Sequence, residues 1–446
     1  MVLAKRISEF VVALDADRIA PETRCKLNAC IVNGFGIALG GRDTPYYRTA
    51  AKAVAGVDGA TGDVTLLYDG RKSTVTNASF VNSALFHGRA QEDTCGTVHV
   101  GAVVIPMLTA LLETQRYPAE RFLPALLAAY EVSGLFDLPY GRITAPVGFR
   151  ATPLYGTLGA AAAAGYLMGL DANQMASALA NAASFSGGIL QSFVEGSDEW
   201  RYQVGVAARN GLTAATLAQA GSVSASEAFE GKAGFVAAFV RTSCDVDALA
   251  SRLGRDWAIQ RVTFKPYPVC AFNQTPVSAA LAVRKEVEVE KILAVRVRMN
   301  PYETGYPGMD AKGPFNSISG TLMSIPFCIA TTLVHGVPSM SHMTAYGDPA
   351  VAALIGRIDL ITDEGIPNLS TLIEVDTPSG TVVQKKYMTT ADYAYDRAGV
   401  SALVRRIGRE QNISDNVYDR LEAFVDGLPG SSIQDVIALF RYEEGT

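Results

Sequence analysis

Residues that could perform acid–base chemistry are concentrated in one short segment of this 446-residue chain, residues 82–106. The segment contains two of the chain's four histidines, two acids and a cysteine: His87, Glu92, Asp93, Cys95 and His99. Helical spacing of apolar residues gives way to turn-forming residues at 93–96, and an apolar helix is predicted from residue 100. The acids and His99 are therefore predicted to lie on a loop between two buried helices, which can hold them rigidly and still admit a substrate.

A second segment, residues 264–270, reads Phe-Lys-Pro-Tyr-Pro-Val-Cys. Its two prolines restrict the backbone on either side of Tyr267, so Lys265 is predicted to be presented from a fixed, extended stretch. The periodicity of the chain changes close to residue 268, which places this segment at a predicted domain junction. Junctions of this kind are where clefts form.

Each of these residues also has an ordinary structural interpretation. His99 and Asp93 could cap the start of a helix. His87 could face the core or orient the loop, and Lys265 could be a solvated lysine at a hinge. Asp93, Cys95 and His99 could also ligate a metal, but nothing elsewhere in the sequence completes a ligand set with the usual spacing. We predict no metal and, because no glycine-rich phosphate loop is found, no other cofactor.

Composition narrows the class of protein. Hydrophobic residues make up 49% of the chain and charged residues 18%, which is ample for a large interior and a subunit interface. The net charge of −6 and the absence of a basic run argue against a nucleic-acid partner. The six cysteines are scattered without a C-x-x-C pair, and the N-terminal residues lack the features of a signal peptide. We therefore predict a cytoplasmic protein.

Two charge-free runs, residues 151–170 and 317–337, are long enough to span a membrane. Both are interrupted by Pro, Gly, Ser or Thr, and the first is dominated by Ala rather than Leu or Ile. They are predicted to be helices buried in a protein core, so no membrane association is expected.

The periodicity of the chain predicts a mainly α fold. Helices are expected over most of the first 267 residues, with a short hairpin at residues 64–76. A strand at 292–299 and a hairpin at 372–386 indicate a smaller α+β unit, and helical spacing returns from residue 399 behind a cap at Ser414 or Asp415. The predicted organisation is a helical domain (1–267), an inserted α+β lid domain (268–396) and C-terminal helices that return to the helical domain (397–446).

The two motif segments resemble the MmgE/PrpD family. The run from His87 to Asp93 is similar to the family motif His-x-Leu-Asp-Phe-Asp-Asp, and Lys265 to Cys270 matches its Lys-x-Tyr-Pro-x-Cys motif. The resemblance implies an all-helical domain with an inserted lid, a homodimer, and a small polycarboxylate as substrate. The family includes 2-methylcitrate dehydratase, cis-aconitate decarboxylase and iminodisuccinate epimerase, and it places the motif lysine in the active site.

Several family positions carry other residues in this chain. Arg150 and Gln203 stand where the family usually has histidine, Trp200 replaces a lysine, and Asn273-Gln274 lie where a further histidine is usual. Elimination of water needs an acid for the leaving hydroxyl as well as a base. The altered pattern instead resembles iminodisuccinate epimerase, which requires only removal and return of an α-hydrogen. A lyase of the 2-methylcitrate dehydratase or cis-aconitate decarboxylase type is the alternative, and a non-catalytic binding protein comes third.

We assign roles on this basis. His99 ranks first as the base because an imidazole titrates near pH 6.5, whereas lysine and tyrosine side chains ordinarily titrate near pH 10. The predicted catalytic residues are His99, Lys265, Asp93 and Tyr267. The predicted substrate-binding residues are Arg150, Arg201, Gln203, His87 and Gln274.

Overall fold

The structure is a computed structural model that describes residues 1–59 and 61–441, and the chain forms two compact units. The larger unit comprises Met1–Ile189, Arg201–Phe264 and Tyr395–Thr446, and the smaller comprises Leu190–Trp200 and Lys265–Ala394. The predicted fold class, mainly helical with a smaller α+β part, is confirmed. The segment Leu190–Trp200 departs from the predicted division, because it belongs to the smaller unit.

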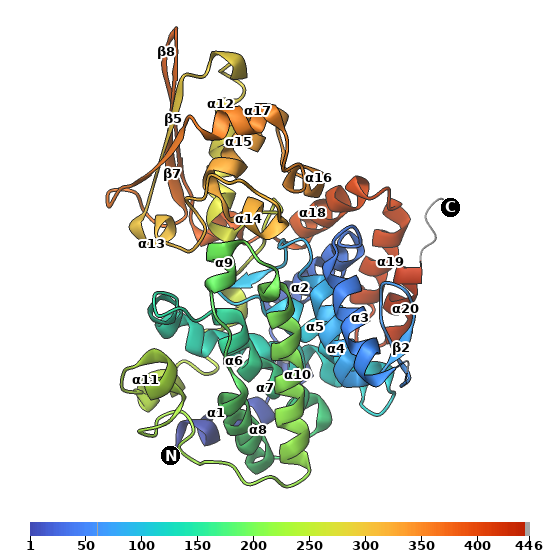
Figure 1. Cartoon of the computed structure of the whole chain (residues 1–446). Coiled ribbons are helices and arrows are strands. Elements are labelled where there is room, and N and C mark those ends of the chain that lie inside the picture. The colour runs from blue at the N-terminus through green and yellow to red at the C-terminus, as the bar shows by residue number, and fades with distance from the viewer. Residues whose placement is uncertain (60, 442–446) are drawn as a thin grey trace. The chain divides into compact units, whose positions relative to one another are not determined.

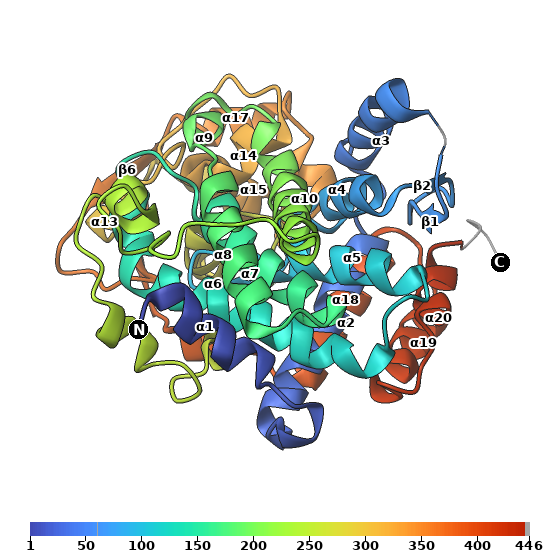
Figure 2. The same ribbon diagram turned by 90° about the horizontal axis from the view of Figure 1, so that it is seen from below.

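The larger unit is built from helices (Figures 1 and 2). They are α1 (Leu3–Val12), α2 (Pro21–Leu39), α3 (Tyr46–Asp58), α4 (Val75–Phe86), α5 (Val100–Glu113), α6 (Phe122–Thr144), α7 (Ala151–Met168), α8 (Ala172–Phe185), α10 (Glu199–Gln219), α11 (Val246–Ala250), α18 (Arg397–Glu410), α19 (Asp415–Asp426) and α20 (Ile433–Ala438). Two small antiparallel pairs accompany them: β1 (Val64–Thr65) with β2 (Lys72–Ser73), and β3 (Thr94–Cys95) with β4 (Val262–Thr263). The first pair is the hairpin predicted at residues 64–76.

The core of this unit lies around α5, α6 and α7. Every residue of α5 is buried, as expected for a helix without a charged residue before Glu113. Small residues let neighbouring helices approach closely: a Cβ at Gly159 on α7 would collide with Ser133 on α6. The charge-free run 151–170 is therefore a core helix, as predicted. Within the described residues, no helix combines the length and apolar character needed to cross a bilayer.

The C-terminal helices pack on the N-terminal part of the same unit. Helix α18 lies against α2, where Gly36 and Gly40 leave room for Val404 and Ile407 (Figure 1). The side chain of Ser414 caps α19 by accepting a hydrogen bond from the backbone N–H of Asn416, as the sequence predicted. The larger unit thus contains helices from both ends of the chain that pack on each other.

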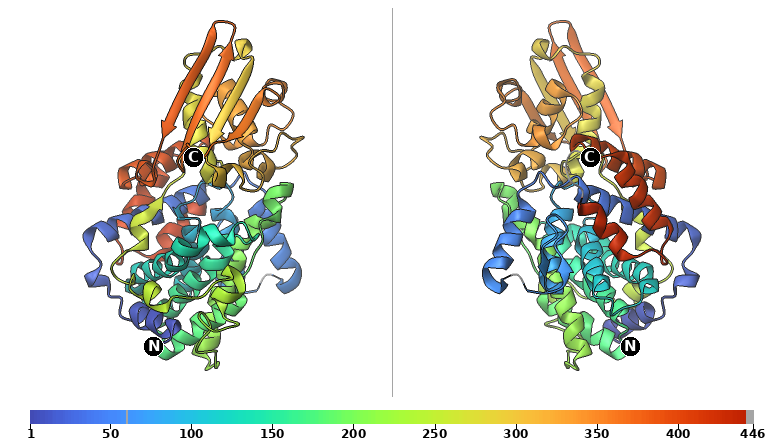
Figure 3. Two further views of the ribbon diagram at one scale, coloured as in Figure 1. Left: turned by 90° about the vertical axis from the view of Figure 1, so that its left-hand side faces the viewer. Right: turned by 90° about the vertical axis from the view of Figure 1, so that its right-hand side faces the viewer.

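The smaller unit contains a four-stranded sheet in the order β6-β5-β7-β8 (Figure 3). The strands are β5 (Ala294–Met299), β6 (Ile358–Thr362), β7 (Ser370–Thr377) and β8 (Gly380–Tyr387). The hairpin of β7 and β8 was predicted, whereas β6, which runs parallel to β5, was not. The helices are α9 (Gln191–Glu195), α12 (Gln274–Val283), α13 (Pro301–Thr304), α14 (Ile318–Met323), α15 (Ile325–His335), α16 (Met340–Met343) and α17 (Pro349–Ile355). Helices α12 and α15 pack against the sheet.

In the larger unit, one buried carboxylate fixes the short helix η4 (Ala258–Arg261) that precedes β4. Glu131 on α6 accepts hydrogen bonds from the backbone N–H groups of Ala258 (2.9 Å) and Ile259 (3.1 Å). Burial raises the pKa of Glu131 from 4.5 to about 7, although these two hydrogen bonds oppose the increase. Because β4 pairs with β3, Glu131 also holds in place the strand that follows Asp93.

This carboxylate predicts how stability depends on pH. The folded-state pKa of Glu131 lies above its unfolded value, so between about pH 4.5 and 7 the folded state binds more protons and stability falls as pH rises. In the variant Glu131→Gln this fall should be smaller. Over this pH range, the change in unfolding free energy should differ between the two proteins by at most about 3 kcal/mol, at about 1.4 kcal/mol for each pH unit.

The measurement is thermal unfolding of both proteins at several pH values between 5 and 8. A constant offset between them is expected, because glutamine presents an N–H₂ group where one acceptor oxygen stood. Equal slopes for the two proteins over this pH range would show that Glu131 is not the group responsible.

Candidate active site

The predicted catalytic loop connects α4 to α5 in the larger unit. His87 directly follows the last residue of α4, and His99 directly precedes the first residue of α5. Between them, β3 pairs with β4, and the hydroxyls of Thr94 and Thr263 lie 2.7 Å apart. Residues 87–95 are all buried. The loop is therefore held at both ends and in the middle, as a rigid catalytic loop requires.

Glu92 is the centre of this loop. Its Oε2 lies 3.1 Å from Nδ1 of His87, and its Oε1 lies 3.1 Å from Nδ1 of His99. The two imidazole rings are 5.4 Å apart between centroids, and only 1% of the Glu92 side chain is exposed. One carboxylate therefore joins both histidines of the segment.

Sequence analysis did not include Glu92 among the site residues. Its signal was visible, because an acid between two histidines in a short loop is placed to contact both. The comparison with the family motif favoured Asp93 instead, since Asp93 is the acid that matches the motif unchanged.

The hydrogen bonds of His87 determine its tautomer. Nη2 of Arg150 lies 2.8 Å from Nε2 of His87, and a guanidinium can only donate, so Nε2 accepts. The proton of the neutral ring must then lie on Nδ1, where it faces Glu92. Burial, together with the charges of Arg150 and Arg201, lowers the pKa of His87 to about 3, against the opposing effect of Glu92. His87 is therefore neutral near pH 7.

His99 is arranged differently. Its Nδ1 faces two acceptors, the carboxylate of Glu92 and the backbone carbonyl of Asp93 at 3.2 Å, so Nδ1 carries the proton. The basic lone pair of the neutral ring is then on Nε2. The side chain is 15% exposed, whereas that of His87 is fully buried, and it makes no capping hydrogen bond to α5. This geometry suits a general base better than a helix cap.

Asp93 lies against helices α5 and α6. Its Oδ2 accepts a hydrogen bond of 2.6 Å from the hydroxyl of Tyr130, and Gly101 makes room for its Oδ1, which a Cβ at that position would strike. Burial and the charge of Asp93 raise the pKa of Tyr130 well above its usual value, so the phenol stays protonated as the donor. Because the backbone carbonyl of Asp93 contacts His99, this arrangement suits a positioning role.

Three further predicted residues lie near His87. Arg150, which precedes α7, is buried, and its Nη1 donates to Oε1 of Gln203 at 3.3 Å. Gln203 in turn donates to the backbone carbonyl of Ile189. Arg201 is fully buried, and its Nη1 donates to the backbone carbonyls of His87 (2.7 Å) and Gly88 (2.8 Å). Two guanidinium groups therefore place positive charge beside the loop.

The remaining predicted residues belong to the smaller unit. Lys265 is its first residue after the junction and is buried. The side chain of Gln274 accepts from the backbone N–H of Tyr267 and donates to the backbone carbonyls of Tyr267 and Val269, each at 3.0 Å. Gln274 thus braces the segment that carries Tyr267. The catalytic and substrate-binding roles given to these residues from the sequence stay predictions.

Metal coordination was the other interpretation of the loop. In the part of the chain that the structure describes, no three His, Cys, Asp or Glu side chains form a group that could hold a metal ion. The polar groups of the loop that we describe instead contact one another and the two arginines.

Comparison with known proteins gives two family matches and several relatives. Residues 5–245 match the MmgE/PrpD N-terminal domain, and residues 267–392 match the MmgE/PrpD C-terminal domain. Human cis-aconitate decarboxylase is 33% identical over 226 residues, which is 49% of this chain and 46% of the human protein. The mouse cis-aconitate decarboxylase is 27% identical over 400 residues, 81% of this chain and 80% of the mouse protein. A cis-aconitate decarboxylase-like protein of Aspergillus oryzae is 25% identical over 275 residues, 58% of this chain and 57% of that protein. The matches to the human and fungal proteins thus span about half the length of each relative.

The tautomers inferred for the loop can be tested without a substrate. The chain has only four histidines, so selective ¹⁵N labelling of histidine should resolve them by NMR, with single-histidine variants providing assignments. His87 and His99 should both carry their proton on Nδ1 near neutral pH. In Glu92→Gln the carboxamide can accept from only one ring, so at least one of the two histidines should change its tautomer or its titration.

The matched control is Glu113→Gln, which alters another buried carboxylate, on α5, that contacts Thr65 and Lys72. It should leave the signals of His87 and His99 unchanged. An Nε2–H tautomer for His99 in the unaltered protein would contradict the geometry.

Proposed function

The chain belongs to the MmgE/PrpD family of enzymes, and within it we propose that this protein is a cofactor-independent epimerase. It would remove the α-hydrogen of an imino-linked dicarboxylate such as iminodisuccinate and return a proton to the opposite face. The observation that carries the proposal is the arrangement of His99, whose Nδ1 proton is held by Glu92 so that Nε2 is the basic atom.

The proton transfer uses the charges around the loop. As the α-carbon–hydrogen bond breaks, His99 Nε2 gains the proton and the electron pair spreads into the adjacent carboxylate. The imidazolium that forms lies 3.1 Å from a Glu92 oxygen, so its charge is stabilised where it develops. Buried positive charge from Arg150 and Arg201 favours an anionic substrate and its enolate-like intermediate. Delivery of a proton to the other face is the role we give to Lys265.

The state of His87 supports an epimerase over an enzyme that expels water. Elimination needs an acid that protonates the leaving hydroxyl near neutral pH. His87 contacts Glu92 through one ring nitrogen and Arg150 through the other, and its pKa of about 3 leaves it without an ionisable proton to give. A reaction in which only a carbon-bound proton moves needs no such acid.

Decarboxylation of a tricarboxylate is the second candidate. It is favoured by the relatives, which are named cis-aconitate decarboxylase or are similar to it. Loss of carbon dioxide leaves a carbanion that must be protonated, and a protonated His99 could supply that proton. The replacement of family histidines by Arg150 and Gln203 weighs against this candidate.

The reaction can be distinguished by solvent exchange. In deuterated water, the enzyme should incorporate deuterium at the α-carbon of iminodisuccinate while optical activity changes, and no water or carbon dioxide should be released. The measurement is proton NMR combined with polarimetry, and cis-aconitate and 2-methylcitrate serve as competing substrates. Faster turnover of either competitor, with release of carbon dioxide or water, would replace the epimerase by a lyase.

Replacing the base should abolish most of this activity. His99→Asn should lower kcat by roughly 10²-fold or more, the scale expected when a general base is lost. Lys265→Met should cause a comparable loss in epimerisation if Lys265 serves the second face. His342→Asn is the matched control, because His342 belongs to the smaller unit and forms a capping box with Ser339. Full activity of His99→Asn would remove the basis of the proposal.

A further inference from the structure

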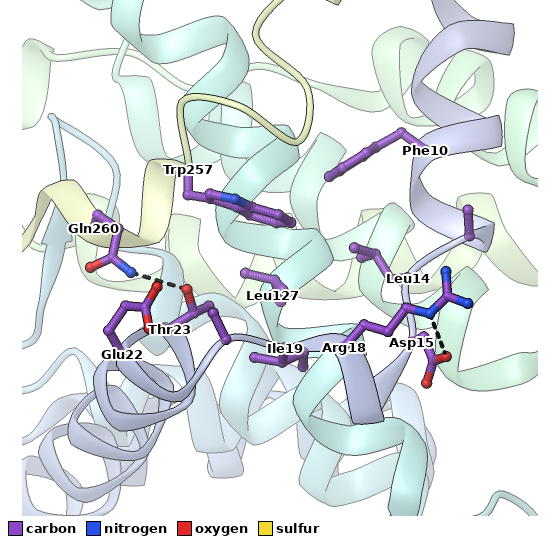
Figure 4. A pocket seen from close by; sticks show the side chains of 12 residues that line it. Phe10, Leu14, Asp15, Arg18, Ile19, Glu22, Thr23, Leu127, Trp257 and Gln260 are labelled. Atoms are coloured by element: carbon purple, nitrogen blue, oxygen red, sulfur yellow. Dashed lines mark hydrogen bonds and ion pairs between the residues drawn. The ribbon is translucent and has the colours of Figure 1, made fainter.

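The larger unit has a cavity that contains none of the candidate site residues. It is a pocket of about 450 Å³, which we call the N-terminal pocket (Figure 4). Its lining comes from the end of α1, the start of α2, α6 and the segment around η4: Phe10, Ala13, Leu14, Asp15, Arg18, Ile19, Ala20, Glu22, Thr23, Leu127, Trp257 and Gln260. A cavity of this volume is in the usual range for small-molecule sites.

The walls of the pocket are aromatic and aliphatic. The rings of Trp257 and Phe10 lie 5.9 Å apart between centroids. Buried Leu127 lies between Thr23 and Leu14 in Figure 4. Leu14 and Ile19 add aliphatic surface, and the side chains of Phe10, Leu14, Ile19 and Trp257 are all half-buried. Partly exposed apolar side chains that converge on a cavity favour a ligand with an apolar body.

The charged residues that line the pocket favour a ligand whose apolar body carries a positive charge. Arg18 and Asp15 are paired, with Nε 3.5 Å from Oδ2, so their charges largely cancel. Glu22, an exposed residue in the first turn of α2, is the second acid of the lining, so the lining residues carry a formal net charge of −1. A protonated amine can be attracted both to this carboxylate and to the face of an indole such as Trp257. A polycarboxylate lacks the positive charge that this carboxylate and the indole face would attract.

The pocket is connected to the catalytic loop through a short run of chain. Trp257 and Gln260 line the pocket, and Gln260 also donates a 3.0 Å hydrogen bond to Thr23 on α2. Within the same run, Ala258 accepts a hydrogen bond from Cys95, and β4 follows and pairs with β3. Thr94 of β3 comes directly after Glu92 and Asp93. A ligand that shifts Trp257 would therefore act on the strand pair that holds the loop.

We propose that the N-terminal pocket binds a small apolar amine and that its occupancy alters the catalytic loop through η4 and the β3–β4 pair. The second part rests on the loop being the active site, but neither part requires that the reaction be epimerisation. Coupling of this kind requires that the ligand prefer one arrangement of the connecting segment over another.

The test uses 2-phenylethylamine as the probe and phenylacetate as a control of similar size and opposite charge. Binding is followed by Trp257 fluorescence in a Trp200→Phe background, because the chain has two tryptophans. The amine should bind with a dissociation constant of about 1 mM or below, as expected for a small fragment, and phenylacetate should bind much more weakly. Glu22→Gln should weaken amine binding roughly 3- to 5-fold, the scale of an exposed ion pair.

Glu9→Gln is the matched control, since Glu9 is an exposed acid on α1 that does not line the pocket. The readout of coupling is the ¹⁵N signal of His99, which the amine should shift in the Glu9→Gln variant and shift less, at equal amine concentration, in Glu22→Gln. Equal binding of both compounds, or no binding of either, would overturn the ligand class. Binding without any change at His99 would overturn the coupling, whatever reaction the enzyme performs.

Discussion

The candidate site depends on one buried carboxylate, that of Glu92. Removing an ionised carboxylate from water costs several kcal/mol unless hydrogen bonds and opposite charge compensate for the lost hydration. Here the compensation comes from two imidazole Nδ1 atoms that each lie 3.1 Å from an oxygen of Glu92 and, one step further, from Arg150 through His87. Because each partner has a fixed donor or acceptor role, the chain Arg150–His87–Glu92–His99 permits only one assignment of protons when both rings are neutral. The contact of Glu92 with Nδ1 of His99 thus makes Nε2 the basic atom of that ring.

The two histidines consequently have different chemistry despite their shared partner. His87 is enclosed and is kept neutral by burial and by the charge of Arg150, so it transmits orientation rather than protons. His99 has partial exposure, and its proton faces a carboxylate that can stabilise the charged ring. Enzymes commonly place two residues of the same type in different environments, so that one supports the structure and the other transfers protons. Arg201 strengthens this division, because it fixes the backbone carbonyls at His87 and Gly88.

Much of this could be predicted from the sequence, and the parts that could not have physical reasons. The loop between α4 and α5, the core helices and both hairpins followed from periodicity and turn residues, which are local signals. The bridging role of Glu92 could not be predicted in this way, because an irregular loop has no periodicity that indicates which side chains face one another. The pairing of β3 with β4 joins residues more than 160 positions apart through strands of two residues each, too short to show alternation. For Arg201, composition and spacing cannot separate a buried guanidinium that holds backbone carbonyls from one that binds substrate.

The resemblance to the family implies that Arg150 stands where a histidine is usual, and an arginine at that position does more than remove one titratable group. A histidine at that position could exchange protons with His87, and the pair could then donate near neutral pH. A guanidinium is permanently charged and can only donate hydrogen bonds, so it makes Nε2 of His87 an acceptor and disfavours a second proton on the ring. The same substitution adds a fixed positive charge next to the loop, which favours substrates that carry several carboxylates. In the function that we propose, this one residue takes the place of a potential acid and adds positive charge, and both effects favour moving a proton at carbon over expelling a leaving group.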